Sequence, residues 1–152
     1  MDILAEFSIA FRLSALKVIE SAYWKWSVRP SQITLGSGII SLKRPASSLA
    51  ELTPDEAVDF VSVVRDSEAV CRHAFKFDKI NYLMLMMRDP QLHFHVIPRY
   101  ATPRVFECED IVDAAWPGPV TFKTGDALEL DPEAVHAHLV SALQELRAER
   151  PV

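Results

Sequence analysis

Hydrophobic and polar residues alternate along several short segments, and such alternation predicts β-strands. The pattern indicates five strands, at residues 16–20, 23–28, 39–43, 81–87 and 91–97. A tight turn at Ser21-Ala22 joins the first two strands, and Arg88-Asp89-Pro90 joins the last two as a hairpin. We therefore expect an antiparallel sheet of about five strands.

Apolar residues recur at helical spacing over 54–75. Thr53 suits the N-cap of this helix, Pro54 its first position, and Glu56 completes a capping box. The stripe expected to face the sheet comprises Ala57, Phe60, Val61, Val64, Cys71 and Ala74.

A second helix is predicted at about 132–148, beginning after Asp131. Its apolar stripe comprises Val135, Leu139, Ala142, Leu143 and Leu146. Residues 2–14 are apolar with poor periodicity and form a short helix or an irregular arm. The Pro-rich stretch 101–125 is expected to wrap over the surface.

Together these elements predict an α+β fold in which the long helix covers one face of the sheet. We expect one domain over 1–152, with a core at about 15–100 and a C-terminal extension over 101–152.

Trp24, Trp26 and Val28 share one strand face and are expected in the core. The alternative is that one of them flanks a ligand base.

Composition narrows the function classes. The 152 residues are 49% hydrophobic and carry a formal net charge of −5, which argues against a broad nucleic-acid-binding surface. No apolar run is long enough to span a bilayer, and the N-terminus lacks a signal-peptide pattern, so we expect a cytoplasmic protein without a membrane partner. Cys71 and Cys108 have no metal-binding spacing.

The last predicted strand carries the candidate chemistry. Its alternation places Gln91, His93 and His95 on one face, and Leu92, Phe94 and Val96 on the face that the long helix covers. The histidine face is expected to be open, as a shelf for substrate.

Three interpretations of His93 and His95 compete. They form a polar sheet face only, or they bind a metal as a His-x-His pair, or one of them is a nucleophile toward phosphorus. A third metal ligand is not evident, and we expect neither a metal nor a cofactor.

The stretch from Gln91 to Arg99 resembles the signature of the histidine triad (HIT) family, in which three histidines alternate with apolar residues before Pro-Arg. Leu35 to Arg44 resembles the family's Pro-Gly-His strand, and Glu51 to Glu56 its helix start. The resemblance covers residues of about 15 to 100 and implies a homodimer with a five-stranded sheet.

The resemblance also implies an activity, in which the middle histidine attacks the α-phosphorus of a nucleotide and water resolves the nucleotidyl-histidine. By position the nucleophile is His93, His95 orients or contacts the phosphate, and Gln91 replaces the first histidine. A glutamine donates and accepts hydrogen bonds but carries no titrating proton. No metal is needed for the covalent step.

Other positions also depart from the family pattern. Ser37 replaces the histidine of Pro-Gly-His, Arg29 lies where the family keeps a ribose-binding Asn or Asp, and the loop ahead of the histidines lacks the Gly-Gln-Ser/Thr motif. We expect substrate contacts from Arg29, Ser37, Lys43, Asn81, Arg88 and Arg99.

Two functions follow. The first is a nucleotide phosphohydrolase or nucleotidyl transferase acting on dinucleoside polyphosphates or nucleoside phosphoramidates. The second, motivated by Gln91, is a nucleotide-binding or regulatory domain of the same fold with little or no catalysis.

Overall fold

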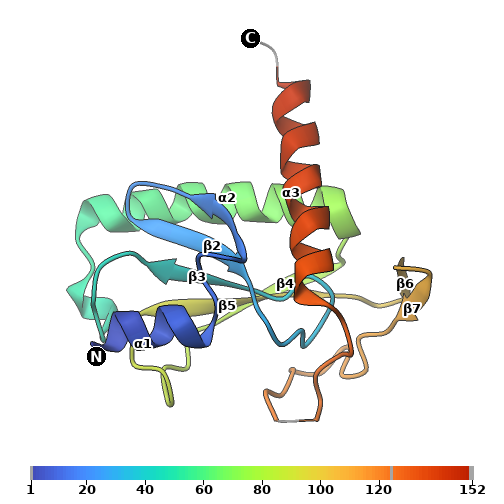
Figure 1. Cartoon of the computed structure of the whole chain (residues 1–152), viewed down its shortest axis with the longest axis horizontal. Helices are drawn as coiled ribbons and strands as arrows, with labels where there is room; N and C mark the ends of the chain where they lie inside the picture. The colour runs from blue at the N-terminus through green and yellow to red at the C-terminus, as the bar shows by residue number, and fades with distance from the viewer. Residues whose placement is uncertain (1, 124, 151–152) are drawn as a thin grey trace.

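An antiparallel five-stranded sheet, with strands in the order β1-β2-β3-β5-β4, organises the computed structural model, which describes residues 2–123 and 125–150. Its strands are β1 (Lys17–Glu20), β2 (Trp24–Val28), β3 (Gly38–Leu42), β4 (Lys79–Leu83) and β5 (His93–Arg99). The helices are α1 (Ile3–Ala10), the short 3-10 helix η1 (Leu49–Glu51), α2 (Pro54–Phe75) and α3 (Pro132–Glu149). A separate hairpin consists of β6 (Arg104–Phe106) and β7 (Glu109–Ile111). The predicted α+β class is confirmed (Figure 1).

Helix α2 begins where its capping signal predicts. The Glu56 amide donates to Thr53 Oγ1 at 3.2 Å, and the Thr53 amide donates to the Glu56 carboxylate at 2.9 Å. Arg44 donates to the same carboxylate at 2.8 and 2.9 Å, which lowers the pKa of Glu56 to about 2. The start of α2 is thereby tied to the end of β3 through a charged pair.

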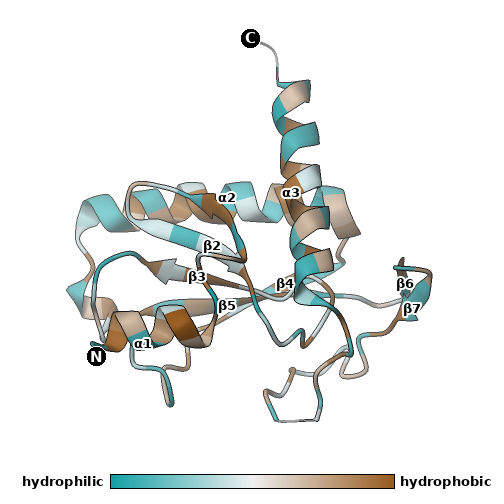
Figure 2. Cartoon of the chain, in the orientation of Figure 1, coloured by the Kyte–Doolittle hydropathy of each residue, from teal (hydrophilic) through white to brown (hydrophobic). Residues whose placement is uncertain are grey.

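The buried face of α2 is offset from the predicted stripe. Ala57 and Val61 are exposed, so their assignment to the core was wrong, whereas Phe60, Val64, Cys71 and Ala74 pack as expected. The fully buried positions are Glu56, Val63, Ser67, Val70, Cys71 and Phe75. The sequence does not reveal the offset, because the buried face includes Glu56 and Ser67, two polar residues whose side chains are hydrogen-bonded within the protein. Hydropathy alone therefore does not identify this face as buried. Hydrophobic and hydrophilic residues alternate along α2 and α3 (Figure 2).

The two faces of the sheet are covered by different helices, with α2 on one side and α1 on the other (Figure 1). Trp24, Trp26 and Val28 are fully buried on the α2 side, which confirms their core role. On the α1 side, Phe7 packs with Ile39 in a second apolar cluster. The expectation of a fully open histidine face is therefore wrong, because the apolar N-terminal arm folds as a helix over part of it and His93 and His95 are buried.

The boundaries of the last two strands differ from the prediction. β4 ends at Leu83, and three residues later Met86 adopts φ of 53°, a left-handed conformation that does not continue a strand. β5 begins at His93 and continues through Pro98, so Gln91 lies before the strand. The tight hairpin is replaced by a loop over 84–92.

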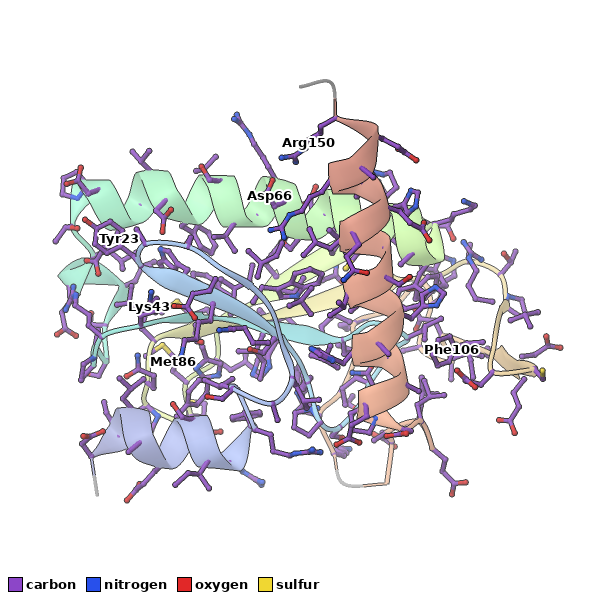
Figure 3. All side chains as sticks on the ribbon, turned by 45° about the horizontal axis from the view of Figure 1, so that its top comes forward. Tyr23, Lys43, Asp66, Met86, Phe106 and Arg150 are labelled. Carbon is purple, nitrogen blue, oxygen red and sulfur yellow. The ribbon has the colours of Figure 1, made fainter. Side chains whose placement is uncertain are left out.

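The C-terminal helix α3 packs against α2 and β1. Its predicted stripe is confirmed: Val135, Leu139, Ala142 and Leu143 are buried, and Leu146 is partly buried against the core. Near its end, Arg150 Nη2 lies 3.7 Å from Oδ1 of Asp66 in α2 (Figure 3). None of the helices in the described part of the chain is both long and apolar enough to cross a membrane.

A buried ion pair joins the end of β5 to the segment after β7. Arg99 Nε and Nη2 donate to the Asp113 carboxylate at 2.7 and 3.2 Å, and both side chains are almost fully buried. Arg99 also donates to Asn81 Oδ1 at 2.9 Å and to the Gly118 carbonyl at 2.6 Å. Every branch of the guanidinium thus has a partner.

Replacing Asp113 by Asn leaves the Arg99 charge buried without a counter-charge, so we expect a loss of about 3 kcal/mol or more in the free energy of unfolding. Urea denaturation measures the loss. The matched control is Asp66→Asn, which removes an exposed ion pair and is expected to change stability by less than about 1 kcal/mol. Equal losses in the two variants would contradict this account.

Candidate functional site

His93 is held by a backbone carbonyl and an aromatic ring. Its Nδ1 lies 2.5 Å from the carbonyl oxygen of Gln91, which only accepts hydrogen bonds, so Nδ1 carries the proton. The Phe7 ring of α1 packs against the imidazole with 4.6 Å between centroids. In the neutral ring Nε2 is therefore the unprotonated nitrogen, with its lone pair available for attack.

His95 follows on the same face of β5. Its ring stands at 86° to that of His93, with 4.9 Å between centroids. Its Nδ1 is buried and has no hydrogen-bond partner among the described residues. A buried polar nitrogen of this kind is costly unless a ligand or water completes it.

Both imidazoles are neutral at pH 7. Burial lowers the pKa of His95 to about 3, and the neighbouring His93 and Arg29 act in the same direction. Burial also lowers the pKa of His93, against the opposing effects of the Gln91 carbonyl and Asp89. Neutral His93 is the form required of a nucleophile.

The two histidines open into a cleft of about 570 Å³. One part of its lining is apolar, from Phe11, Leu85, Met86, Met87 and Phe122. Another part is charged, with the cations Arg29, Arg88 and Lys123 and a single carboxylate, Asp89. The cleft thus combines two neutral imidazoles, an apolar surface and an excess of positive charge.

Among the predicted substrate contacts, the structure places Arg29 and Arg88 at this cleft beside His93 and His95. The Arg29 guanidinium lies over the Phe122 ring at 5.0 Å. Burial is the main cause that lowers the pKa of the Arg29 guanidinium.

The side chain of Gln91 lies elsewhere. Its Nε2 donates to the carbonyls of Arg44 and Leu42 at 2.8 and 3.2 Å, and its Oε1 accepts from the Ala46 amide at 3.3 Å. The prediction that this amide shares the histidine face was wrong, because Gln91 precedes the strand. It is the backbone carbonyl of Gln91 that touches His93.

Four further candidates also lie outside the cleft lining. Ser37 Oγ bonds to the carbonyl and the amide of Thr34 within a turn, at 2.8 and 2.9 Å. Asn81 and Arg99 bond to one another, as described above. Lys43 pairs with Glu20 and lines a different hollow beside Tyr23 (Figure 3).

Sequence reasoning missed the aromatic and C-terminal parts of the site. Phe7 comes from α1 and Phe11 is the C-cap of that helix, whereas Phe122 and Lys123 come from the extension after β7. No periodicity marks residues 121–123, so only the folded chain identifies them. Leu85 and Met86 were predicted as strand residues, but they lie in the loop that follows β4, and this loop carries them to the cleft.

The described residues contain no cluster of three or more His, Cys, Asp or Glu side chains arranged to hold a metal ion. His93 and His95 therefore have no third ligand of these types within the described part of the chain.

The pKa of His95 predicts an acid-sensitive fold. Below pH 6.5 the unfolded chain binds a proton at this position, whereas the folded chain does so only near pH 3, so lowering the pH destabilises the native state. The free energy of unfolding of the wild type should fall as the pH is lowered from 6 to 4. In His95→Asn we expect this fall to be smaller, by up to about 1.4 kcal/mol per pH unit. Denaturation at several pH values measures the slope, and an unchanged slope would contradict the assignment.

Comparison with known proteins gives matches at the level of structure. No family model matches the sequence, and no curated protein matches it significantly. A histidine triad protein of Sinorhizobium meliloti is 23% identical, with a TM-score of 0.67 over 88% of this chain and 92% of that one. A hypothetical histidine triad nucleotide-binding protein of Sulfolobus tokodaii is 18% identical, with a TM-score of 0.66 over 95% and 93%. A zinc-bound histidine triad family protein of Mycobacterium smegmatis is 16% identical, with a TM-score of 0.65 over 88% and 87%. The chain therefore has the histidine triad fold.

Proposed function

We propose that the chain is a nucleotide phosphohydrolase or nucleotidyl transferase that uses His93 as its nucleophile. The observation that carries this proposal is the hydrogen bond from His93 Nδ1 to the Gln91 carbonyl, which leaves Nε2 as the nitrogen with a lone pair. Burial supports the same conclusion, because it lowers the pKa of His93 and keeps the ring neutral.

The proposed reaction has two steps. His93 Nε2 forms a bond to the α-phosphorus, and the bond from phosphorus to the leaving group breaks, with its electron pair going to the leaving group. The imidazole becomes cationic in this step, and the Gln91 carbonyl stabilises the Nδ1–H. Water then attacks phosphorus and loses a proton to solvent, the N–P bond breaks with its electron pair returning to His93 Nε2, and a nucleoside monophosphate is released. An alcohol or amine in place of water gives transfer.

The cleft supports a nucleotide ligand. Arg29 and Arg88 line the cleft as cations suited to phosphate oxygens, and His95 carries a buried nitrogen without a partner among the described residues. The apolar surface at Phe11 and Met86 suits a base. Dinucleoside polyphosphates and nucleoside phosphoramidates are the proposed substrates. One of the structural neighbours is named as a hypothetical nucleotide-binding protein, which agrees with this class.

We also propose that the protein works in the cytoplasm as a homodimer. β4 is an edge of the five-stranded sheet, so its outer backbone groups are placed to pair with another strand. Light scattering that gives the mass of a single 17.1 kDa chain at micromolar concentration would contradict the dimer.

The covalent step is tested with diadenosine tetraphosphate and adenosine phosphoramidate. We expect AMP release, and mass spectrometry of a rapidly quenched sample is expected to show one AMP on His93. His93→Ala should lower turnover by about 10³-fold or more and abolish the adduct.

His136→Ala is the matched control, because this histidine lies on α3 and bonds to the Lys17 carbonyl away from the cleft. It is expected to leave turnover unchanged. Nucleotide that raises the melting temperature without any product or adduct would overturn the enzymatic proposal in favour of a binding domain.

A further inference from the structure

Arg29 is fixed by the loop in which it lies. Its amide donates to the Ser37 carbonyl at 2.9 Å, and Gln32 Nε2 donates to the carbonyls of Arg29 and Ser37 at 2.7 and 2.8 Å. Arg29 Nη1 donates to the Ser31 carbonyl at 2.7 Å. The backbone and one branch of the guanidinium are therefore held in place without any ligand.

Another part of the guanidinium is left unsatisfied. Arg29 Nε is buried and has no hydrogen-bond partner within residues 2–123 and 125–150. Over the same residues, the only other buried side-chain nitrogen or oxygen atoms without a hydrogen-bond partner are Trp26 Nε1 and His95 Nδ1. Two of these three nitrogens thus belong to residues that line one cleft. A buried donor of this kind costs free energy, so its retention points to an acceptor supplied by a ligand.

Phe122 connects the two unsatisfied residues. Its ring lies 5.0 Å from the Arg29 guanidinium carbon and 4.8 Å from the centroid of His95. The extension that carries Phe122 is tied to the Arg29 loop, because the Leu128 amide donates to the Gln32 carbonyl at 2.7 Å. Stacking on an aromatic face restricts a guanidinium to one plane.

The charge of the cleft favours an anion with more than one charged group. Arg29, Arg88 and Lys123 line it against Asp89 alone, although the chain as a whole carries a net charge of −5. In the described part of the chain, none of the three cations lies in an ion pair with a carboxylate. One phosphate at His93 does not neutralise such a set.

We propose that Arg29, held flat by Phe122 and assisted by Lys123, forms a subsite for a second oxyanion of the ligand, beyond the phosphorus that His93 attacks. The chemical class is a phosphate or an equivalent tetrahedral oxyanion on the leaving group. Phe122 is a positioning residue, because it acts through Arg29. The assignment of this oxyanion to a leaving group rests on the proposed function.

The test is calorimetric titration with inorganic tripolyphosphate, which requires no turnover. We expect the wild-type chain to bind it and Arg29→Gln to bind about tenfold to hundredfold more weakly, as loss of a charged hydrogen bond implies. Arg29→Lys keeps the charge but loses the planar stack, and is expected to fall between the two. Phe122→Leu and Lys123→Gln should each weaken binding at least threefold.

Arg72 and Phe77 provide a matched control, since this arginine also lies over an aromatic ring, at 4.7 Å, but outside the cleft. Arg72→Gln and Phe77→Leu are expected to bind tripolyphosphate as the wild type does. Circular dichroism confirms that each variant is folded.

The outcomes separate the two proposals. Tripolyphosphate binding that is absent, or equal in Arg29→Gln and wild type, overturns the subsite and leaves the His93 adduct unaffected. Binding that depends on Arg29 in a protein that forms no AMP adduct supports the subsite and overturns the covalent function.

Discussion

The pairing of β5 with β3 on one side and β4 on the other fixes the direction of every side chain between His93 and Arg99. The pleat of a strand held on both edges sends successive side chains to opposite faces, so Phe94 and Val96 enter the core under α2 while His93 and His95 enter the cleft. A slip of one residue would exchange these two sets, and the apolar core opposes that slip. The packing of the core thus maintains the geometry of the site.

Burial then determines the chemistry of the polar groups on the cleft face. The imidazoles are neutral because the surrounding aromatic rings desolvate them, and the Gln91 carbonyl selects which nitrogen of His93 carries the proton. Arg99 and Arg29 show two outcomes for a desolvated guanidinium. Arg99 is satisfied by Asp113 and serves the fold, whereas Arg29 keeps an unpartnered Nε among the described residues and faces the cleft.

Much of this arrangement was predictable from local patterns. The capping box at Thr53, the apolar stripe of α3 and the alternation from Leu92 to Val96 each depend on neighbours within a few residues. Gln91 was misplaced because the partners of its amide lie more than forty residues earlier in the chain. The stripe of α2 was offset because its buried polar positions are hydrogen-bonded, Glu56 to Arg44 outside the helix and Ser67 to the Val64 carbonyl within it, so hydropathy does not mark them as buried.

By itself the sequence determined the five strands of the main sheet, the two long helices, the α+β class and the position of the histidines on one face of a strand, since helical and strand periodicities and helix caps are short-range effects. It did not reveal the β6–β7 hairpin within the stretch 101–125. Only the tertiary structure decided which polar side chains reach the cleft. Of the six residues predicted to contact substrate, it places Arg29 and Arg88 at the cleft, and it brings there Phe11 from the C-cap of α1 and Phe122 from the extension. The physical reason is that a side chain's environment depends on segments distant in sequence that fold over it, and no local pattern encodes those contacts.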